Sequence, residues 1–233
     1  MTNLKTEIIL ALDVDTNEQA NVILDQVGDQ LTWVKIGLQS YLRDGPKIIE
    51  KCVESGKKIF LDLKLHDIPN TMSKAIESLS RLPISMLTLH TCSGPEAMSL
   101  CKDTAQKFMP DATLLGVTVL TSMNQANLNS VGIMKTPEEQ VLHLAKLANK
   151  SGLEGIVCSP KELVPLRSVL PREIKMVTPG IRPAGSNAGD QKRTLTPKEA
   201  QQAGADYLVV GRPILTSPNP AEAIEFILKE LNE

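Results

Sequence analysis

The stretch "FLDLKLHDIPNT", residues 60–71, begins with the alternation of a β-strand. Leu63 and Leu65 alternate here with Asp62, Lys64 and His66. Because strand side chains repeat every second residue, these three polar residues fall on one face of the strand. Charged side chains are rarely buried without a partner, so the rest of the chain must explain why this strand carries them.

Similar short apolar or β-branched runs recur along the chain, and most are followed by a helical pattern. Three helices, over residues 16–27, 136–152 and 219–231, are well marked by a Thr or Asn that can cap the first turn and by an apolar stripe. The predicted strands cover residues 8–14, 33–37, 58–65, 86–90, 114–120, 155–159, 175–180 and 207–211.

These alternations of strand and helix are not interrupted by a linker rich in Gly, Ser or Pro. They predict a single domain of the α/β class over residues 1–233. We expect a closed (β/α)8 TIM barrel, and an open doubly wound sheet is the alternative.

The composition is that of an ordinary globular protein, with 42% hydrophobic residues and a formal net charge of −2. This near-neutral balance argues against nucleic acid or a membrane surface as the main partner. No run approaches the roughly 20 apolar residues of a membrane span, and the N-terminus lacks a signal-peptide pattern, so we expect a cytoplasmic protein. The cysteines form no CxxC pair and are expected to be small buried thiols, not metal ligands: Cys52, Cys92, Cys101 and Cys158.

Polar residues stand at the ends of most predicted strands, where a barrel would direct them toward one mouth. They are Asp13, Lys35, Asp62, Lys64, Asp67, His90, Thr121, Ser159 and, directly after Gly211, Arg212. Salt bridges that merely fill the barrel are the alternative explanation. Because so many successive strands share this feature, we favour a ligand site.

Two segments indicate a phosphorylated ligand. "YLVVGRPIL", residues 207–215, ends a strand on glycine and turns directly to Arg212, as expected where backbone amides and a guanidinium bind phosphate after the last barrel strand. The polar segment "TPGIRPAGSNAGDQKRTLTP", residues 178–197, is long enough to serve as a binding loop, with a flexible surface connection as the alternative.

Seven motifs together resemble the bacterial orotidine 5′-phosphate decarboxylases: "LALDVD", "VKIG", "DLKLHDIPNT", "TVLTSM", "TPGIRP", "GDQKR" and "VVGRPI". The resemblance extends from about residue 8 to residue 215. It implies a (β/α)8 homodimer that converts orotidine 5′-monophosphate (OMP) to uridine monophosphate (UMP) and carbon dioxide in pyrimidine biosynthesis, without a metal or an organic cofactor.

The resemblance also implies the role of each matching residue. Asp62 and Lys64 match the catalytic pair, Lys35 a lysine of the charge network and ribose site, and Asp67 an aspartate that enters the active site of the neighbouring subunit. The remaining matches bind the substrate, with Ser122 as an alternative to Thr121 at the pyrimidine: Asp13, Thr71, Thr121, Arg182, Gln191, Gly211 and Arg212.

The chemistry of the reaction agrees with this charge pattern. Decarboxylation leaves an electron pair in the plane of the pyrimidine ring, where conjugation cannot delocalise it, so a fixed cation must stabilise it. Lys64, flanked by Asp62 and by Asp67 of a second chain, can stay an ammonium and deliver the proton. The alternatives are a metal-dependent sugar-phosphate enzyme of the same superfamily and a catalytically silent nucleotide-binding protein.

Overall fold

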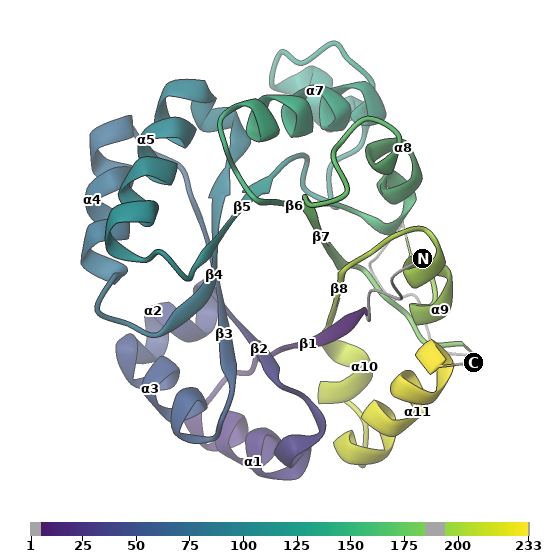
Figure 1. Cartoon of the computed structure of the whole chain (residues 1–233). Helices are drawn as coiled ribbons and strands as arrows, with labels where there is room; N and C mark the ends of the chain where they lie inside the picture. Colours follow the sequence, from purple (N-terminus) through teal and green to yellow (C-terminus); the bar gives the residue numbers. More distant parts are fainter. Residues whose placement is uncertain (1–5, 185–193, 233) are drawn as a thin grey trace.

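In the computed structural model, which describes residues 6–184 and 194–232, eight parallel strands close into a barrel in the order of the chain. Each strand pairs with its neighbours in sequence, and β1 closes the ring against β8 (Figure 1). The predicted (β/α)8 barrel is confirmed, and the open sheet is excluded. The strands are β1 Glu7–Ala11, β2 Trp33–Gly37, β3 Lys58–Leu65, β4 Ile84–His90, β5 Thr113–Val117, β6 Gly155–Val157, β7 Lys175–Pro179 and β8 Tyr207–Val210.

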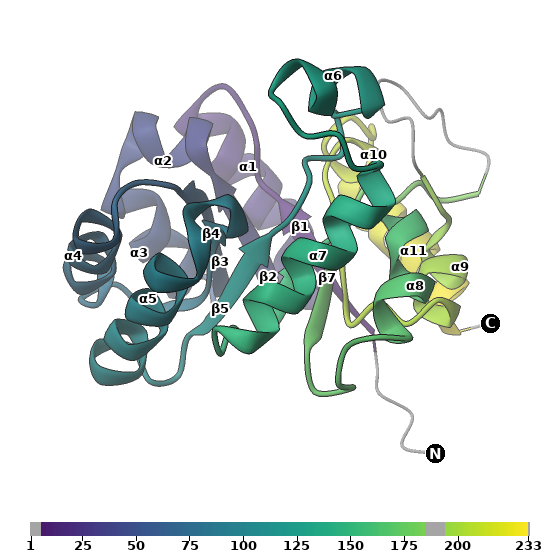
Figure 2. The same ribbon diagram turned by 90° about the horizontal axis from the view of Figure 1, so that it is seen from above.

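The helices form an outer ring around these strands (Figure 1). In the view from the side, α6 and α10 lie toward the end of the barrel to which the strands lead (Figure 2). None of the described helices is long and apolar enough to cross a lipid bilayer. The helices are α1 Asn17–Val27, α2 Leu38–Asp44, α3 Pro46–Glu54, α4 Pro69–Leu79, α5 Gly94–Phe108, α6 Gln125–Ser130, α7 Pro137–Lys150, α8 Leu163–Arg167, α9 Pro197–Gln202, α10 Arg212–Leu215 and α11 Pro220–Asn232, with short 3-10 turns η1 Gly28–Gln30, η2 Thr91–Ser93 and η3 Pro160–Glu162.

The three helices with clear sequence signals begin where the signals predict. The side chains of Thr16 and Thr136 accept hydrogen bonds from the third residue of α1 and α7, completing a capping box in both. The Asn219 side chain caps α11 by accepting the Glu222 N–H at 3.4 Å. These caps satisfy amide groups that have no partner inside the helix.

Five predicted strands extend too far at their C-terminal ends: 155–159 by two residues, 175–180 and 207–211 by one, and the two that follow by three. The run 114–120 is apolar except at Gly116 and Thr118, yet β5 ends at Val117, and Val119 and Leu120 instead line a cavity at the mouth of the barrel. The first predicted strand, 8–14, likewise ends early, at Ala11. An apolar residue at such a position can contact a cavity or the core without belonging to a paired strand, so apolar sequence alone does not mark where a strand ends.

Apolar side chains form two layers. Those that point away from the barrel axis pack under the helices. Those that point inward fill the barrel toward the N-terminal ends of its strands. Trp33, predicted to belong to the core, is 5% exposed and donates its indole N–H to Glu7 at 3.3 Å. The inner layer consists of Ile9, Ala11, Trp33, Phe60, Met86, Leu115, Val177 and Val209.

The inward positions change from apolar to polar toward the C-terminal ends of β2, β3 and β4. Two residues beyond Trp33, Phe60 and Met86 of the inner layer, the chain places Lys35, Asp62 and Thr88. Because side chains repeat every second residue along a strand, each of these apolar side chains has a polar side chain next to it on the side of the barrel mouth. The barrel interior therefore has a polar layer near its C-terminal end and an apolar layer beneath it.

Three of the four cysteines are buried, as expected, but Cys92 is exposed. It lies in the turn η2, where the chain leaves β4 at the open end of the barrel, so the prediction of a buried thiol is wrong for Cys92. Burial raises the pKa of Cys101 to about 11.

A buried ion pair secures the opposite end of the barrel. The Asp206 carboxylate, just before β8, binds the guanidinium of Arg167, approaches Arg172 at 3.4 Å and accepts the Met176 N–H at 2.7 Å. Burial lowers the pKa of Arg167 below its ordinary value, and the Asp206 carboxylate opposes this shift.

The substitution Asp206→Asn should lower the free energy of unfolding by about 3 kcal/mol, because it leaves the Arg167 guanidinium buried without its counter-charge. Urea unfolding followed by circular dichroism measures this loss. Glu77→Gln, which removes one partner of an exposed pair on α4, serves as the control and should leave the midpoint unchanged. Equal midpoints for the two variants would contradict a stabilising role for Asp206.

Candidate active site

A cavity of about 190 Å³ opens at the C-terminal ends of the strands. One wall carries the charged side chains of Lys35, Asp62 and Lys64, from β2 and β3. The opposite wall is largely apolar and comes from β5 to β8 and the residues that follow these strands. Phe60 lies between the two walls. The apolar wall comprises Val117, Val119, Leu120, Val157, Pro179 and Val209.

The charged wall is a chain of alternating carboxylates and ammonium groups. Lys35 Nζ lies 2.9 Å from Asp13 Oδ2 and 3.8 Å from Asp62 Oδ2. Lys64 Nζ lies 2.8 Å from the same Asp62 oxygen. The sequence predicts that charged residues at the ends of the first three strands converge. The structure brings four of them together: Asp13, Lys35, Asp62 and Lys64.

These groups become more accessible toward the mouth. The side chains of Lys35 and Asp62 are 10% and 12% exposed, whereas Lys64 is 31% and Asp13 is 42% exposed. Each buried charge has an opposite charge beside it, which compensates for the loss of water. The arrangement places a fixed ammonium group, Lys64, at the wall of a largely apolar cavity, where it can stabilise an anion.

The backbone of β3 departs from a regular strand at Lys64, whose φ of +51° is in the left-handed region. For a residue with a side chain this conformation costs about 1–2 kcal/mol. The Lys64 N–H donates to Thr88 Oγ1 at 2.9 Å. Sequence reasoning missed Thr88, although the polar residue within "MLTLH" falls in the inward row with Met86 and His90.

Gly37, at the end of β2, is a second residue that sequence reasoning did not assign. A Cβ atom at this position would lie 2.8 Å from Asp13 Oδ1 and 2.9 Å from Lys35 Nζ. Its φ of −89° is open to any residue, so glycine is needed here for space and not for backbone freedom. The absence of a side chain leaves room for the Asp13–Lys35 pair.

Asp67 and Thr71 do not reach the charged cavity of their own chain. Both are exposed, and with Leu63, Lys64 and Leu65 they line a separate hollow beside the end of β3 and the start of α4. Asp67 Oδ1 accepts the N–H of the next residue at 2.7 Å.

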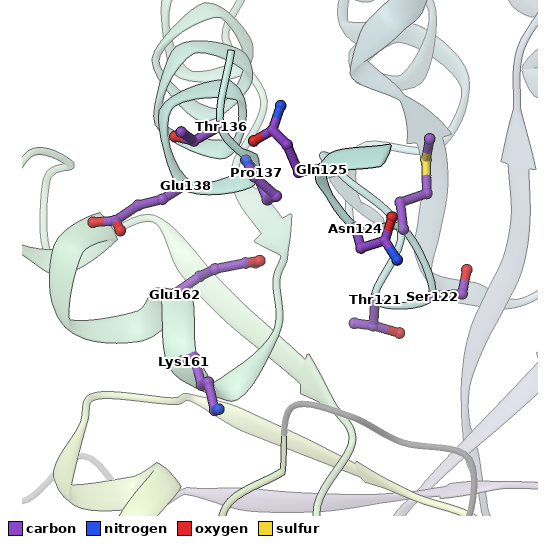
Figure 3. A pocket seen from close by; sticks show the side chains of 10 residues that line it. Thr121, Ser122, Asn124, Gln125, Thr136, Pro137, Glu138, Lys161 and Glu162 are labelled. Atoms are coloured by element: carbon purple, nitrogen blue, oxygen red, sulfur yellow. The ribbon is translucent and has the colours of Figure 1, made fainter. Parts of the chain in front are cut away.

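Thr121 and Ser122 occupy different surroundings. Thr121 lines the charged cavity with Lys64 and also borders a larger outer hollow of about 470 Å³, whereas Ser122 lines only the outer hollow. Figure 3 shows this hollow, with Thr121 and Ser122 on one side and Lys161 across from them. Of the two candidates for a base contact, the geometry therefore favours Thr121.

The predicted phosphate residues lie just beyond the cavity. Arg182 follows Pro179, and Gly211 and Arg212 follow Val209, where Pro179 and Val209 are both wall residues. The Arg182 N–H donates to the Leu195 carbonyl at 3.0 Å. Arg212 and Asp13 share another hollow at the mouth. Gln191 lies outside the described residues.

Two histidines lie side by side near Lys64. The rings of His66 and His90 are 5.4 Å apart between centroids, with His66 exposed beyond the end of β3. Burial lowers the pKa of His90 below its ordinary value, and the nearby His66 and Lys64 act in the same direction. In the described part of the chain, no three His, Cys, Asp or Glu side chains are grouped so that they could hold a metal ion.

Comparison with known proteins places the chain in a family. The family profile described as "Orotidine 5'-phosphate decarboxylase / HUMPS family" matches residues 6–227. The chain belongs to this family. The resemblance predicted from its motifs is confirmed.

Relatives in the OMP decarboxylase family align with nearly the whole chain. Orotidine 5′-phosphate decarboxylase from Opitutus terrae is 49% identical, covering 97% of this chain and 98% of its own. The same enzyme from Idiomarina loihiensis is 44% identical, covering 97% and 98%. The crystal structure of the enzyme from Lactobacillus acidophilus matches with a TM-score of 0.87 at 39% identity, covering 98% of this chain and 100% of that chain.

The substitution Gly37→Ala should lower kcat/KM by about tenfold or more, because the added methyl group must push apart Asp13 and Lys35. Steady-state assays with OMP measure the change, and circular dichroism checks that the variant folds. An unchanged kcat/KM would mean that the ion pair relaxes around the methyl group without consequence.

Proposed function

We infer that this chain is an orotidine 5′-phosphate decarboxylase, a carboxy-lyase that converts OMP to UMP and carbon dioxide. Its family and its relatives of 44% and 49% identity support the reaction. The observation that carries the assignment of roles is the position of Lys64 Nζ, 2.8 Å from Asp62 at the wall of the cavity.

Lys64 acts on the carbon that loses the carboxylate. When the bond to the carboxylate breaks, its electron pair stays on carbon six of the pyrimidine and carbon dioxide departs. The adjacent ammonium stabilises this pair, then transfers one proton to it and becomes a neutral amine. A proton from solvent restores the ammonium after the product leaves.

Asp62 keeps this ammonium in place, and Lys35 helps to hold Asp62. Asp62 Oδ2 lies between the two lysines, so it attracts both and holds Lys64 at the cavity wall. Asp62 also faces the space that the departing carboxylate of the substrate occupies. The apolar opposite wall excludes water and strengthens these interactions.

The remaining residues hold the nucleotide. Asp13 and Lys35 contact the ribose, and Thr121 contacts the pyrimidine. The phosphate lies at the mouth, where the Gly211 backbone and two arginines can bind it. The phosphate-binding set is Arg182, Gln191, Gly211 and Arg212.

The active site is completed by a second copy of the chain in a cytoplasmic homodimer. The exposed position of Asp67 and Thr71, outside the cavity of their own chain, supports this arrangement. Ile68, next to Asp67, is 66% exposed, as expected for a residue that a partner covers. In the dimer, Asp67 of the partner reaches Lys64 and adds a second carboxylate to the network.

The parent protein should decarboxylate OMP in excess EDTA, and Lys64→Ala should lower kcat about 1,000-fold or more, because the developing carbanion loses its cation. The fall in OMP absorbance measures both. Lys74→Ala, which removes an exposed lysine of α4, is the matched control and should retain full activity. No turnover by folded parent protein would reject the decarboxylase and favour a metal-dependent sugar-phosphate enzyme or a silent nucleotide-binding protein.

Mixing Lys64→Ala with Asp67→Ala, after dissociation and reassociation, should restore activity, because one site of each mixed dimer holds an intact Lys64 and an intact partner Asp67. Random exchange would recover about one quarter of the parental activity. The control mixes Lys64→Ala with the double variant, which cannot form an intact site. No recovery in a mixture shown to contain mixed dimers would place Asp67 in its own chain's site.

A further inference from the structure

The pairing of β3 with β4 is irregular next to the active site. Leu61 pairs with Leu87, and the next pair is Leu65 with Leu89. Three residues of β3, from Asp62 to Lys64, therefore lie opposite a single residue of β4, which is Thr88. This bulge preserves the inward direction of both catalytic side chains and displaces the Lys64 amide from regular strand pairing.

Thr88 satisfies the groups that the bulge displaces. Its side chain is fully buried, and its Oγ1 accepts the Lys64 N–H at 2.9 Å. The same Oγ1 donates to Asp62 Oδ1 at 2.9 Å. A hydroxyl has only one hydrogen to donate, so the direction of both bonds is fixed.

The hydroxyl acts on the side of Asp62 that the lysines leave open. Lys64 Nζ and Lys35 Nζ approach Asp62 Oδ2, whereas Thr88 binds Oδ1. The carboxylate is thus held from two directions and cannot rotate without losing a partner. The hydroxyl also holds the backbone of Lys64 in its left-handed conformation.

We propose that Thr88 is a positioning residue for catalysis, whose hydroxyl fixes the Asp62 carboxylate and the Lys64 backbone in the geometry that the reaction requires. The proposal rests on the roles assigned to Asp62 and Lys64 above. Thr88 does not line the cavity, so it acts through these residues and not by touching the substrate.

The test compares Thr88→Val, which keeps the branched shape but removes the hydroxyl, with Thr88→Ser, which keeps the hydroxyl. Thr88→Val should lower kcat at least about tenfold, while KM for OMP and the Kd for UMP change less than about threefold, because misplaced catalytic groups weaken mainly the transition state. Thr88→Ser should retain kcat within about threefold of the parent.

Thr6→Val is the control for loss of a buried hydroxyl. Thr6 is 6% exposed and donates to the Ala205 carbonyl at 2.9 Å, away from the cavity. This variant should lose stability but keep kcat. If Thr88→Val does not fold, Thr88→Ala removes the same hydroxyl without adding bulk and carries the comparison with serine.

Three outcomes would overturn the proposal: an unchanged kcat in Thr88→Val, an equal fall in kcat for valine and serine, or a loss confined to KM and UMP binding. The first would make the hydroxyl dispensable, the second would show that the hydroxyl alone does not sustain kcat, and the third would make Thr88 a determinant of binding. Failure of the inferred reaction is distinguishable, because the parent protein itself would then be inactive toward OMP.

Discussion

The rest of the site depends on a single carboxylate, Asp62, which is shared by two lysines and a threonine. One of its oxygens lies near Lys35 and Lys64, and the other accepts the Thr88 hydroxyl. Without this carboxylate two ammonium groups would face each other inside a poorly hydrated cavity, where like charges repel strongly. The barrel can hold the Lys64 cation at the wall of the cavity because it holds this anion between its second and fourth strands.

The residues that stabilise the barrel and the charged residues of the cavity lie toward opposite ends of the strands. Apolar inward residues and the Asp206 ion pair lie toward the N-terminal ends of the strands, whereas the charged residues lie at the C-terminal ends. The apolar layer beneath the cavity gives the charges a rigid and weakly polarisable support. Left-handed backbone at Lys64 is tolerated because β3 pairs regularly with β2 below it, from Lys58 to Asp62.

Much of this arrangement can be predicted from local sequence. The period of two in "FLDLKL" places Asp62 and Lys64 on one face, and capping signals locate the starts of α1, α7 and α11. These features depend on residues close in the chain. The strand ends were harder to predict, because apolar residues such as Val119 contact the cavity as well as any paired strand would.

The features that local sequence could not predict depend on contacts between different strands. The bulge depends on the register of β3 against β4, and the need for glycine at position 37 depends on Asp13, which is 24 residues away. Neither contact leaves a periodic signal in the sequence. The exposed Asp67 also has no assignable role within one chain, so family resemblance supplied the expectation that a partner uses it.

The unequal walls of the cavity have a consequence for recognition. Charged side chains come from β2 and β3, and the facing side chains from β5 to β8 are mostly apolar. A flat heterocycle with one anionic edge can satisfy both walls in one orientation only, with the anionic edge toward the lysines. If the ring were reversed, the anionic edge would lie against valines and the ammonium of Lys64 would lose that counter-charge. In the proposed reaction, the barrel thus turns the anionic end of a nearly planar molecule toward Lys64 before any bond breaks.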